Sequence, residues 1–185
     1  IGTAGTCGTD SAVDWLLEIT KEIADDLCQS LKIAVLRSSQ PIQRIQKALA
    51  SGKIHALPHA PDISDDVIGK CSNIVALAGA EQIAKAIETG ADIIIAGRTT
   101  DTATIAALPI MRGLNEGAAW HGAKIGECGA LCATNPQAGV VLIDFDNTGF
   151  TVTPMAEGSQ ATPHTVSAHM LYENSDPFIL YEPGG

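Results

Sequence analysis

Hydrophobic positions near the start of the chain recur at helical intervals. The intervals are three or four residues, which puts the apolar side chains on one face of a helix. The positions concerned are Val13, Leu16, Ile19, Ile23 and Leu27. Thr9, Asp10 or Ser11 can cap the start of such a helix, because their side-chain oxygens accept a backbone N–H. The pattern therefore predicts a first helix with one buried face.

Short apolar runs follow, and each precedes a loop and a second helical pattern. The runs cover residues 31–36, 73–78 and 92–96, and the helices are predicted at 42–50, 81–89 and 101–111. One or two helical turns are also expected within 62–70. A strand, a loop and a helix repeated in this way indicate a parallel sheet with right-handed crossovers. The fold class we predict is α/β, with a Rossmann-like, doubly wound, mostly parallel sheet.

The pattern changes in the last third of the chain. Residues 120–133 are predicted to form a helix that carries three glycines, and 140–143 and 150–153 alternate around the turn 146–149, which indicates a β-hairpin. A last helix is expected from Pro163, capped by Thr162, to about Tyr172. We predict an α/β core over 1–135 and a β-hairpin plus helix extension over 136–185, packed on that core.

The chain opens on glycines at positions 2, 5 and 8, just before the first predicted helix. Such a loop normally follows a strand, so we expect a missing strand and a fragment of a longer chain. Free backbone N–H groups at a helix start attract anions. Gly5, Thr6, Gly8 and Thr9 are therefore candidate anion-binding residues, and the alternative is a tight turn that needs glycine for its backbone angles.

Composition narrows the function classes. The net charge is −10, and no basic stripe is present, which argues against nucleic-acid binding. No apolar run approaches the ~20 residues that span a bilayer. The five cysteines are scattered, which favours a reducing compartment over a disulfide framework. We expect a cytoplasmic protein that works as a homo-oligomer or with a partner subunit.

The loop after the run 92–96 is the second candidate site. Ligands of open α/β sheets bind beyond the carboxyl ends of the strands, and Arg98, Thr99, Thr100 and Asp101 stand there. The Arg98 guanidinium can hold a carboxylate or a phosphate in two parallel hydrogen bonds. Asp101 is a candidate base or metal ligand, or equally the cap of the next helix.

The glycine-bearing helix is the third candidate site. His121, Lys124 and Cys128 are three and four residues apart and would share a face, with Glu127 beside them. Imidazole and carboxylate can move protons, and a thiol next to an imidazole can act as a nucleophile. Glycines at 122, 126 and 129 each cost a helix ~1 kcal/mol relative to alanine, so either close packing or close ligand approach must offset them. Cysteines outside disulfides, such as Cys128, are also often buried packing residues.

A structural zinc site is not predicted. The spacing of His121, Cys128 and Cys132 is not a standard ligand set, and Pro58 lies between His55 and His59. The sequence identifies no cofactor, and it leaves metal dependence open. We expect His121 with Cys128 or Glu127 to line the same cleft as Arg98, within ~10 Å, as groups that act on one substrate must.

Several segments resemble the acyclic terpene utilisation AtuA family. They are residues 2–14, 90–101, 119–130 and 169–177, which include Gly-Arg-Thr-Thr-Asp, Glu-Cys-Gly-Ala and Leu-Tyr-Glu-Asn-Ser-Asp-Pro. The resemblance implies a catabolic protein of a pathway that degrades branched acyclic terpenoids as acyl-CoA thioesters. After Ala130 the chain continues Leu-Cys-Ala-Thr-Asn-Pro, unlike terpene members, which implies a branch outside them.

Three function hypotheses remain open at this stage. The first is an enzyme acting on a small carboxylate or an acyl-CoA in a hydratase or lyase step, with Arg98 binding the anion and Asp101, Glu127 or His121 moving the proton. The second is a non-catalytic ligand-binding subunit of a multisubunit catabolic complex. The third is acyl transfer or hydrolysis through the Cys128 thiol.

Overall fold

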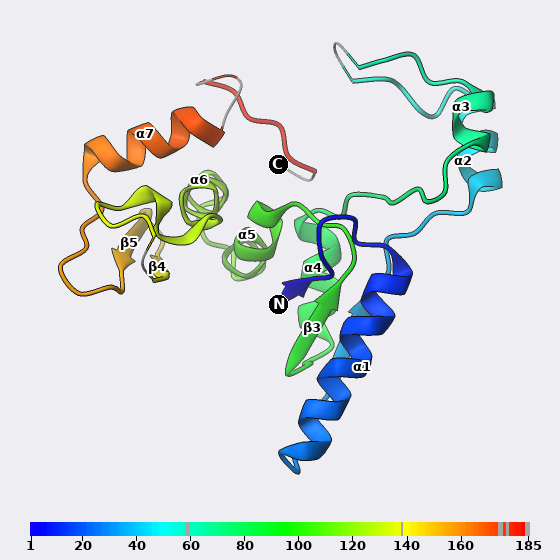
Figure 1. The fold of residues 1–185 in the computed structure, drawn as a ribbon. Helices are drawn as coiled ribbons and strands as arrows, with labels where there is room; N and C mark the ends of the chain where they lie inside the picture. The colour runs from blue at the N-terminus through cyan, green and yellow to red at the C-terminus, as the bar shows by residue number, and fades with distance from the viewer. Residues whose placement is uncertain (58–59, 138, 174–175, 177, 184–185) are drawn as a thin grey trace. The chain divides into compact units, whose positions relative to one another are not determined.

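The computed structural model describes residues 1–57, 60–137, 139–173, 176 and 178–183 (Figure 1). Pro58, His59 and Pro177, used in the sequence argument, lie outside these ranges. The chain divides into two compact units. The first comprises Ile1–Leu77 with Ala91–Thr99, and the second Ala78–Gly90 with Thr100–Gly185.

A parallel sheet forms the centre of the first unit. Its strands are β1 (Gly2–Thr3), β2 (Ile33–Leu36) and β3 (Ile93–Ala96), in the order β1-β3-β2. Both neighbours run parallel to β3, with Ile33 opposite Ile93. The mixed α/β class and the two longer predicted strands are confirmed. A two-residue strand, β1, precedes the glycine loop and pairs with β3, and the expectation that the sheet of this fragment lacks a strand stays a prediction.

The helix α1 (Asp10–Asp26) packs its first half on this sheet. Thr9 is its N-cap and accepts a hydrogen bond from the backbone N–H of Ala12. Val13 is fully buried against Ala4 and Ile95. The predicted buried face does not extend along the whole helix, because Ile23 and Leu27 are 52% and 60% exposed within the chain.

The run 73–78 is not a strand, which corrects the third predicted strand. Val75 forms an isolated antiparallel bridge with Ser39, in the loop after β2. Two backbone hydrogen bonds accompany this bridge: Gln40 N–H donates to Ile74 O, and Ala76 N–H donates to Ser38 O. The apolar run therefore pairs with the loop after β2 and does not add a strand to the parallel sheet. The helices nearby are α2 (Ile42–Ala50) and α3 (Asp65–Gly69).

Helices with small residues build the second unit. α5 (Asp101–Met111) packs on α6 (Glu116–Gly126) through fully buried Ala106, Ala119 and Ala123. Alanine allows the two backbones to approach closely, so a core forms with few aromatic residues. The remaining elements are α4 (Ala80–Glu88), the 3-10 helix η1 (Gly129–Cys132), β4 (Val141–Phe145), β5 (Phe150–Pro154) and α7 (Pro163–Glu173). The predicted hairpin and last helix are confirmed.

The glycine-bearing helix is shorter than its prediction. α6 ends at Gly126, and Gly129 has a φ of +60°, a left-handed conformation that starts the tighter η1 turn. Cys128 is therefore not on the helical face of His121 and Lys124, which corrects that part of the prediction.

Close packing explains two of the three glycines. A Cβ on Gly122 would stand 2.7 Å from Phe145 Cε1, and a Cβ on Gly126 would stand 2.2 Å from Ile143 Cδ1. The hairpin β4–β5 thus lies directly on the glycine face of α6. The cost of the glycines is offset by packing here and not by a ligand.

Candidate functional sites

The glycine loop lies at the carboxyl edge of the parallel sheet. Because β1, β2 and β3 run in one direction, the loops that follow them leave from one edge. These loops hold Gly5–Gly8, Arg37–Gln40 and Gly97–Thr99. This is the edge at which open α/β sheets bind ligands. Within the first unit, the glycine loop and Arg98 therefore lie at the edge of the sheet where the sequence predicted them.

Close backbone packing joins the first and third loops. Gly8 has a φ of +60°, and a Cβ there would stand 2.2 Å from the backbone nitrogen of Arg98. Gly97 also packs closely, on the second loop, since its Cβ would lie 2.6 Å from the Ser38 hydroxyl oxygen. Gly8 is thus needed for packing. Gly5 has a φ of +67° with open space around it, so its turn needs glycine while its surface remains free.

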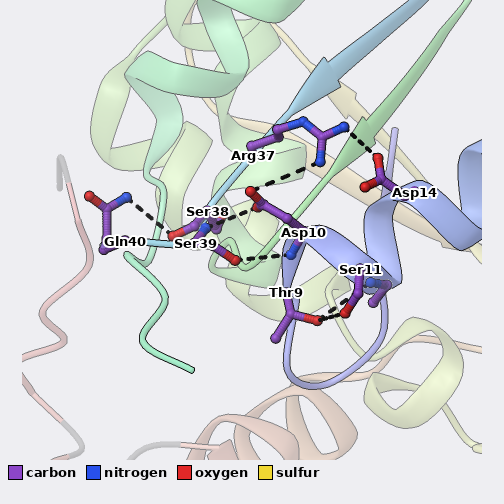
Figure 2. A network of polar contacts seen from close by, with 9 residues as sticks. Thr9, Asp10, Ser11, Asp14, Arg37, Ser38, Ser39 and Gln40 are labelled. Atoms are coloured by element: carbon purple, nitrogen blue, oxygen red, sulfur yellow. Dashed lines mark hydrogen bonds and ion pairs between the residues drawn. The ribbon is translucent and has the colours of Figure 1, made fainter. Parts of the chain in front are cut away.

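A polar network ties α1 to the loop after β2 (Figure 2). The backbone N–H of Asp10 donates to Ser39 Oγ at 3.0 Å, and the N–H of Ser39 donates to Asp10 Oδ1 at 3.1 Å. Arg37 forms ion pairs with Asp10 and Asp14. The hydrogen bond from Arg37 lowers the pKa of Asp14, and in return the pKa of Arg37 is raised. These charges satisfy one another, so the network holds the loops in place.

Arg98 and the exposed part of the glycine loop meet at this edge. The Arg98 guanidinium donates to the backbone oxygen of Thr6 at 3.3 Å, and Gly5 and Thr6 are exposed. Thr99 is fully buried, and its hydroxyl has no hydrogen-bond partner within the ranges that the structure describes. The structure thus brings together Thr6, Gly8 and Arg98 from the predicted anion site.

The cap of α5 is Thr100. Its side chain accepts the backbone N–H of Ala103, and Asp101 is the exposed first residue of the helix. The alternative role of Asp101 as the cap is therefore wrong, and Thr100 has a structural function.

A buried acid–base cluster connects α5 and α6 in the second unit. Lys124 Nζ lies 2.6 Å from Glu127 Oε1, and the two side chains are only 10% and 6% exposed. The second Glu127 oxygen, Oε2, lies 2.5 Å from Thr102 Oγ1. Glu182, from the C-terminal segment, places Oε1 3.0 Å from the same hydroxyl. Buried charges need this kind of pairing, because an isolated one costs several kcal/mol.

A cavity of about 360 Å³ opens beside the cluster. Its polar end includes Thr102, Lys124 and Glu182, and His121 stands on its wall. Glu127 lies behind this end, where it binds Lys124 and Thr102. The remaining wall is largely apolar and is made by Gly117, Trp120, Met170, Asp176, Phe178, Ile179 and Leu180. Small-molecule sites typically combine such an apolar wall with a few placed polar groups.

His121 and the cysteines have different surroundings. The His121 ring meets Phe150 edge-to-face at 5.3 Å, and the residue is exposed. Cys128 is half-buried at the start of η1. Cys132 is fully buried, and burial raises the pKa of its thiol, so it remains a protonated packing residue. Buried packing is the alternative role that the sequence analysis gave for the cysteines.

Thr102 and Glu182 are the members of the cluster that sequence reasoning missed. Thr102 had a weak signal, since Thr102 and Thr104 are the two hydroxyl residues in a helix that is otherwise apolar after Asp101. Glu182 had none, because it meets Thr102 across 80 positions. No group of three metal-ligating side chains and no helix able to span a membrane occurs in the ranges given above. The predicted common cleft of Arg98 with His121 stays a prediction.

A comparison with protein families finds one match over residues 1–184, to the model described as acyclic terpene utilisation family protein AtuA. No curated protein and no solved structure matches the chain.

Proposed function

Because the chain belongs to the acyclic terpene utilisation family AtuA, we propose that it is an enzyme that removes a proton next to the carbonyl of a branched acyl group, as a hydratase or lyase does. Family membership suggests a role in acyclic terpene utilisation. The observation that carries the proposal is the Lys124–Glu127–Thr102 cluster at the polar end of the 360 Å³ cavity.

The cavity wall supports an apolar acyl chain as the substrate. Trp120, Met170 and Leu180 contribute apolar surface to it, and Lys124 and Glu182 belong to the polar cluster around Thr102. An acyl group placed along this wall presents its carbonyl to Lys124. Burial of the chain drives binding at about 25 cal/mol per Å² of apolar area, and the polar end fixes the direction.

Lys124 has the chemistry to stabilise the charge that the reaction creates. When the carbon next to the carbonyl loses its proton, the electron pair moves onto the carbonyl oxygen as an enolate. The Lys124 ammonium, beside Glu127 at the polar end of the cavity, carries a positive charge that can stabilise the enolate oxygen. A carboxyl group of the cluster takes the proton, with Glu182 on the cavity side.

Solvent deuterium exchange tests this step without knowledge of the product. In D₂O the enzyme should replace hydrogen next to the carbonyl of a branched acyclic acyl-CoA, followed by mass spectrometry. Glu127→Gln should slow exchange by about 100-fold, as expected for a lost acid–base group. Asp66→Asn is the matched control, because Asp66 forms an equally short but exposed pair with Lys70, and it should exchange at the unaltered rate.

The outcomes of the same assay separate the other hypotheses. Saturable binding without exchange would overturn the enzyme proposal in favour of a ligand-binding subunit. His121→Ala should slow exchange less than Glu182→Gln, and the reverse order would assign the proton step to the imidazole. Loss of activity in Cys128→Ser with normal activity in Glu127→Gln would favour the thiol mechanism.

For the loop edge of the first unit we propose an anion-binding role, in the Rossmann-like arrangement expected from the sequence. The guanidinium of Arg98 beside the exposed Gly5–Thr6 turn supports binding of a phosphate or a carboxylate. Arg98→Ala should weaken binding of inorganic phosphate, measured by calorimetry, by about tenfold or more. The control Arg112→Ala, at the end of α5, should leave phosphate binding unchanged; equal effects would refute the role.

A further inference from the structure

The hydroxyl of Thr102 lies between two carboxyl groups. Its Oγ1 is 2.5 Å from Glu127 Oε2 and 3.0 Å from Glu182 Oε1, both hydrogen-bond distances. A threonine hydroxyl has one proton and can donate one hydrogen bond, although it can accept two. If it donates to one carboxylate, the other contact is a hydrogen bond only when that carboxyl group itself supplies a proton.

The net charge of the cluster also indicates one additional proton. Lys124 brings one positive charge, and ionised Glu127 and Glu182 would bring two negative charges. Thr102 is 1% exposed, the Glu127 side chain is 6% exposed and Glu182 is half-buried, so an excess negative charge here would be incompletely solvated. One added proton makes this group of four residues neutral.

Other ionisable groups stand near the cluster on each element that packs there. His121 is on α6, Asp101 is next to Thr102 on α5, Asp176 is on the cavity wall, and Glu81 on α4 approaches Gly79, which packs on Pro183. Three of these four groups are acidic. Their negative charges favour the protonated form of the carboxyl pair and supply no positive charge in place of the proton.

We infer that Glu127 and Glu182 share one proton through the Thr102 hydroxyl and act as a single acid–base unit, with Glu182 facing the cavity and Glu127 behind it. This inference rests on the proposed function for its catalytic meaning. Its structural part, a protonated carboxyl group in the resting protein, is independent of any substrate.

The proton movement balances without a co-reactant. At rest the shared proton is on Glu127, which donates it to Thr102 Oγ1, while the Thr102 hydroxyl donates to the Glu182 carboxylate. When Glu182 accepts a proton from substrate, both carboxyl groups are neutral, and the charge of Lys124 balances that of the enolate. Return of one proton from Glu182 to the product restores the resting state. Thr102 is a positioning residue in this scheme, because it acts through the two carboxyl groups.

Infrared spectroscopy tests the shared proton directly. At pH 7, where solvated glutamates are ionised, the intact protein should show the carbonyl band of a protonated carboxyl group. Glu127→Gln and Glu182→Gln should each remove the band. Thr102→Val, which keeps the side-chain shape, should shift or remove it, and Thr102→Ser, which keeps the hydroxyl, should restore it. Circular dichroism establishes that each variant is folded.

Absence of the band from the folded wild-type protein, or a band that is the same in all these variants, would overturn the inference. The result does not depend on deuterium exchange. A band that behaves as expected in a protein without exchange activity would refute the proposed function alone. With activity present, the pH profile of exchange should be displaced in Thr102→Val and not in Thr102→Ser.

Discussion

At the scale of single residues, Asp146 shows how one carboxylate organises a turn. Its Oδ1 accepts hydrogen bonds from the backbone N–H and the hydroxyl of Thr148, both at 2.6 Å, and from the N–H of Gly149 at 2.8 Å. These bonds favour the ionised form and lower the pKa of Asp146, with the Thr148 hydroxyl as the largest cause. The hairpin signal in the sequence therefore has a physical basis in this side chain.

A pH titration of Asp146 is the first prediction. Since the folded pKa is below its ordinary value of 3.8, the stabilisation is present above that value and is lost as the pH falls through the folded pKa. Thr148→Ala should raise the pKa of Asp146, measured by carboxyl-carbon NMR. Thr151→Ala, on the neighbouring strand, is the control. An unchanged pKa in Thr148→Ala would contradict the hydrogen-bond explanation.

The glycine loop gives a second prediction, in which two glycines with similar φ angles respond differently. Gly5→Ala should cost about 1–2 kcal/mol, the left-handed strain alone. Gly8→Ala should cost about 2–5 kcal/mol, because its Cβ would also meet the Arg98 backbone. Urea unfolding measures both free energies, and equal losses would show that the close approach at Gly8 is not important.

Residue-level prediction from sequence worked where the partner is local. Thr9 and Thr162 were predicted as caps or possible caps, and each accepts a backbone N–H three residues later. The role of Asp101 was left open among base, metal ligand and helix cap, and the structure shows that the neighbouring Thr100 is the cap. The buried contacts of Thr102 are long-range, so no local pattern could indicate them.

At the scale of elements, α6 is defined by what packs on each of its faces. Its glycine face receives Phe145, Phe150 and Ile143 of the hairpin, and alanines face α5. Lys124 and His121 reach the cavity. One short helix thus has two faces that pack on neighbouring elements and one face that lines the cavity.

Alanine substitutions on α6 provide the third prediction. Gly122→Ala should destabilise the protein by about 1–3 kcal/mol less the gain in helix propensity, because the new Cβ would overlap Phe145 and Phe150. Gly117→Ala should stabilise it by about 0.5–1 kcal/mol, since this glycine is exposed and, among the described residues, its new Cβ would contact Asn115 Oδ1 at 3.5 Å without overlap. Thermal unfolding measures both, and stabilisation by Gly122→Ala would contradict the packing described.

Elements were predictable to the extent that the hydrophobic pattern reports burial. β2, β3, α4 and α5 lie close to their predicted positions. The run 73–78 failed because an apolar stretch does not reveal whether a partner strand exists, and Val75 meets a loop residue instead. The end of α6 failed because the left-handed Gly129 could not be distinguished from a tolerated helical glycine.

At the scale of the whole molecule, the chain combines two compact units with separate candidate sites. In the first, parallel strand ends present Arg98 and the glycine loop. In the second, the Lys124–Glu127–Thr102 cluster and the apolar wall form the cavity. The sequence identified residues of both sites, and the contact of Glu182 with Thr102 could come only from the folded chain.

Fluorescence of Trp120 tests the central claim that this cavity binds the acyl substrate. The protein has two tryptophans, Trp15, which is 68% exposed on α1, and Trp120, on the cavity wall. In Trp15→Phe, a branched acyclic terpenoid acid should change the Trp120 emission in a saturable manner.

The variant Leu180→Glu, which places a charge on the cavity wall, should weaken this binding by at least about tenfold, or ~1.4 kcal/mol. Leu131→Glu is its control, because Leu131 is exposed to a similar extent, 43% against 41%, and lies outside this cavity. We predict a saturable change of Trp120 emission in Trp15→Phe. Adding Leu180→Glu should remove this change, and adding Leu131→Glu should not. Ligand binding detected by calorimetry without any change in Trp120 emission would contradict the account.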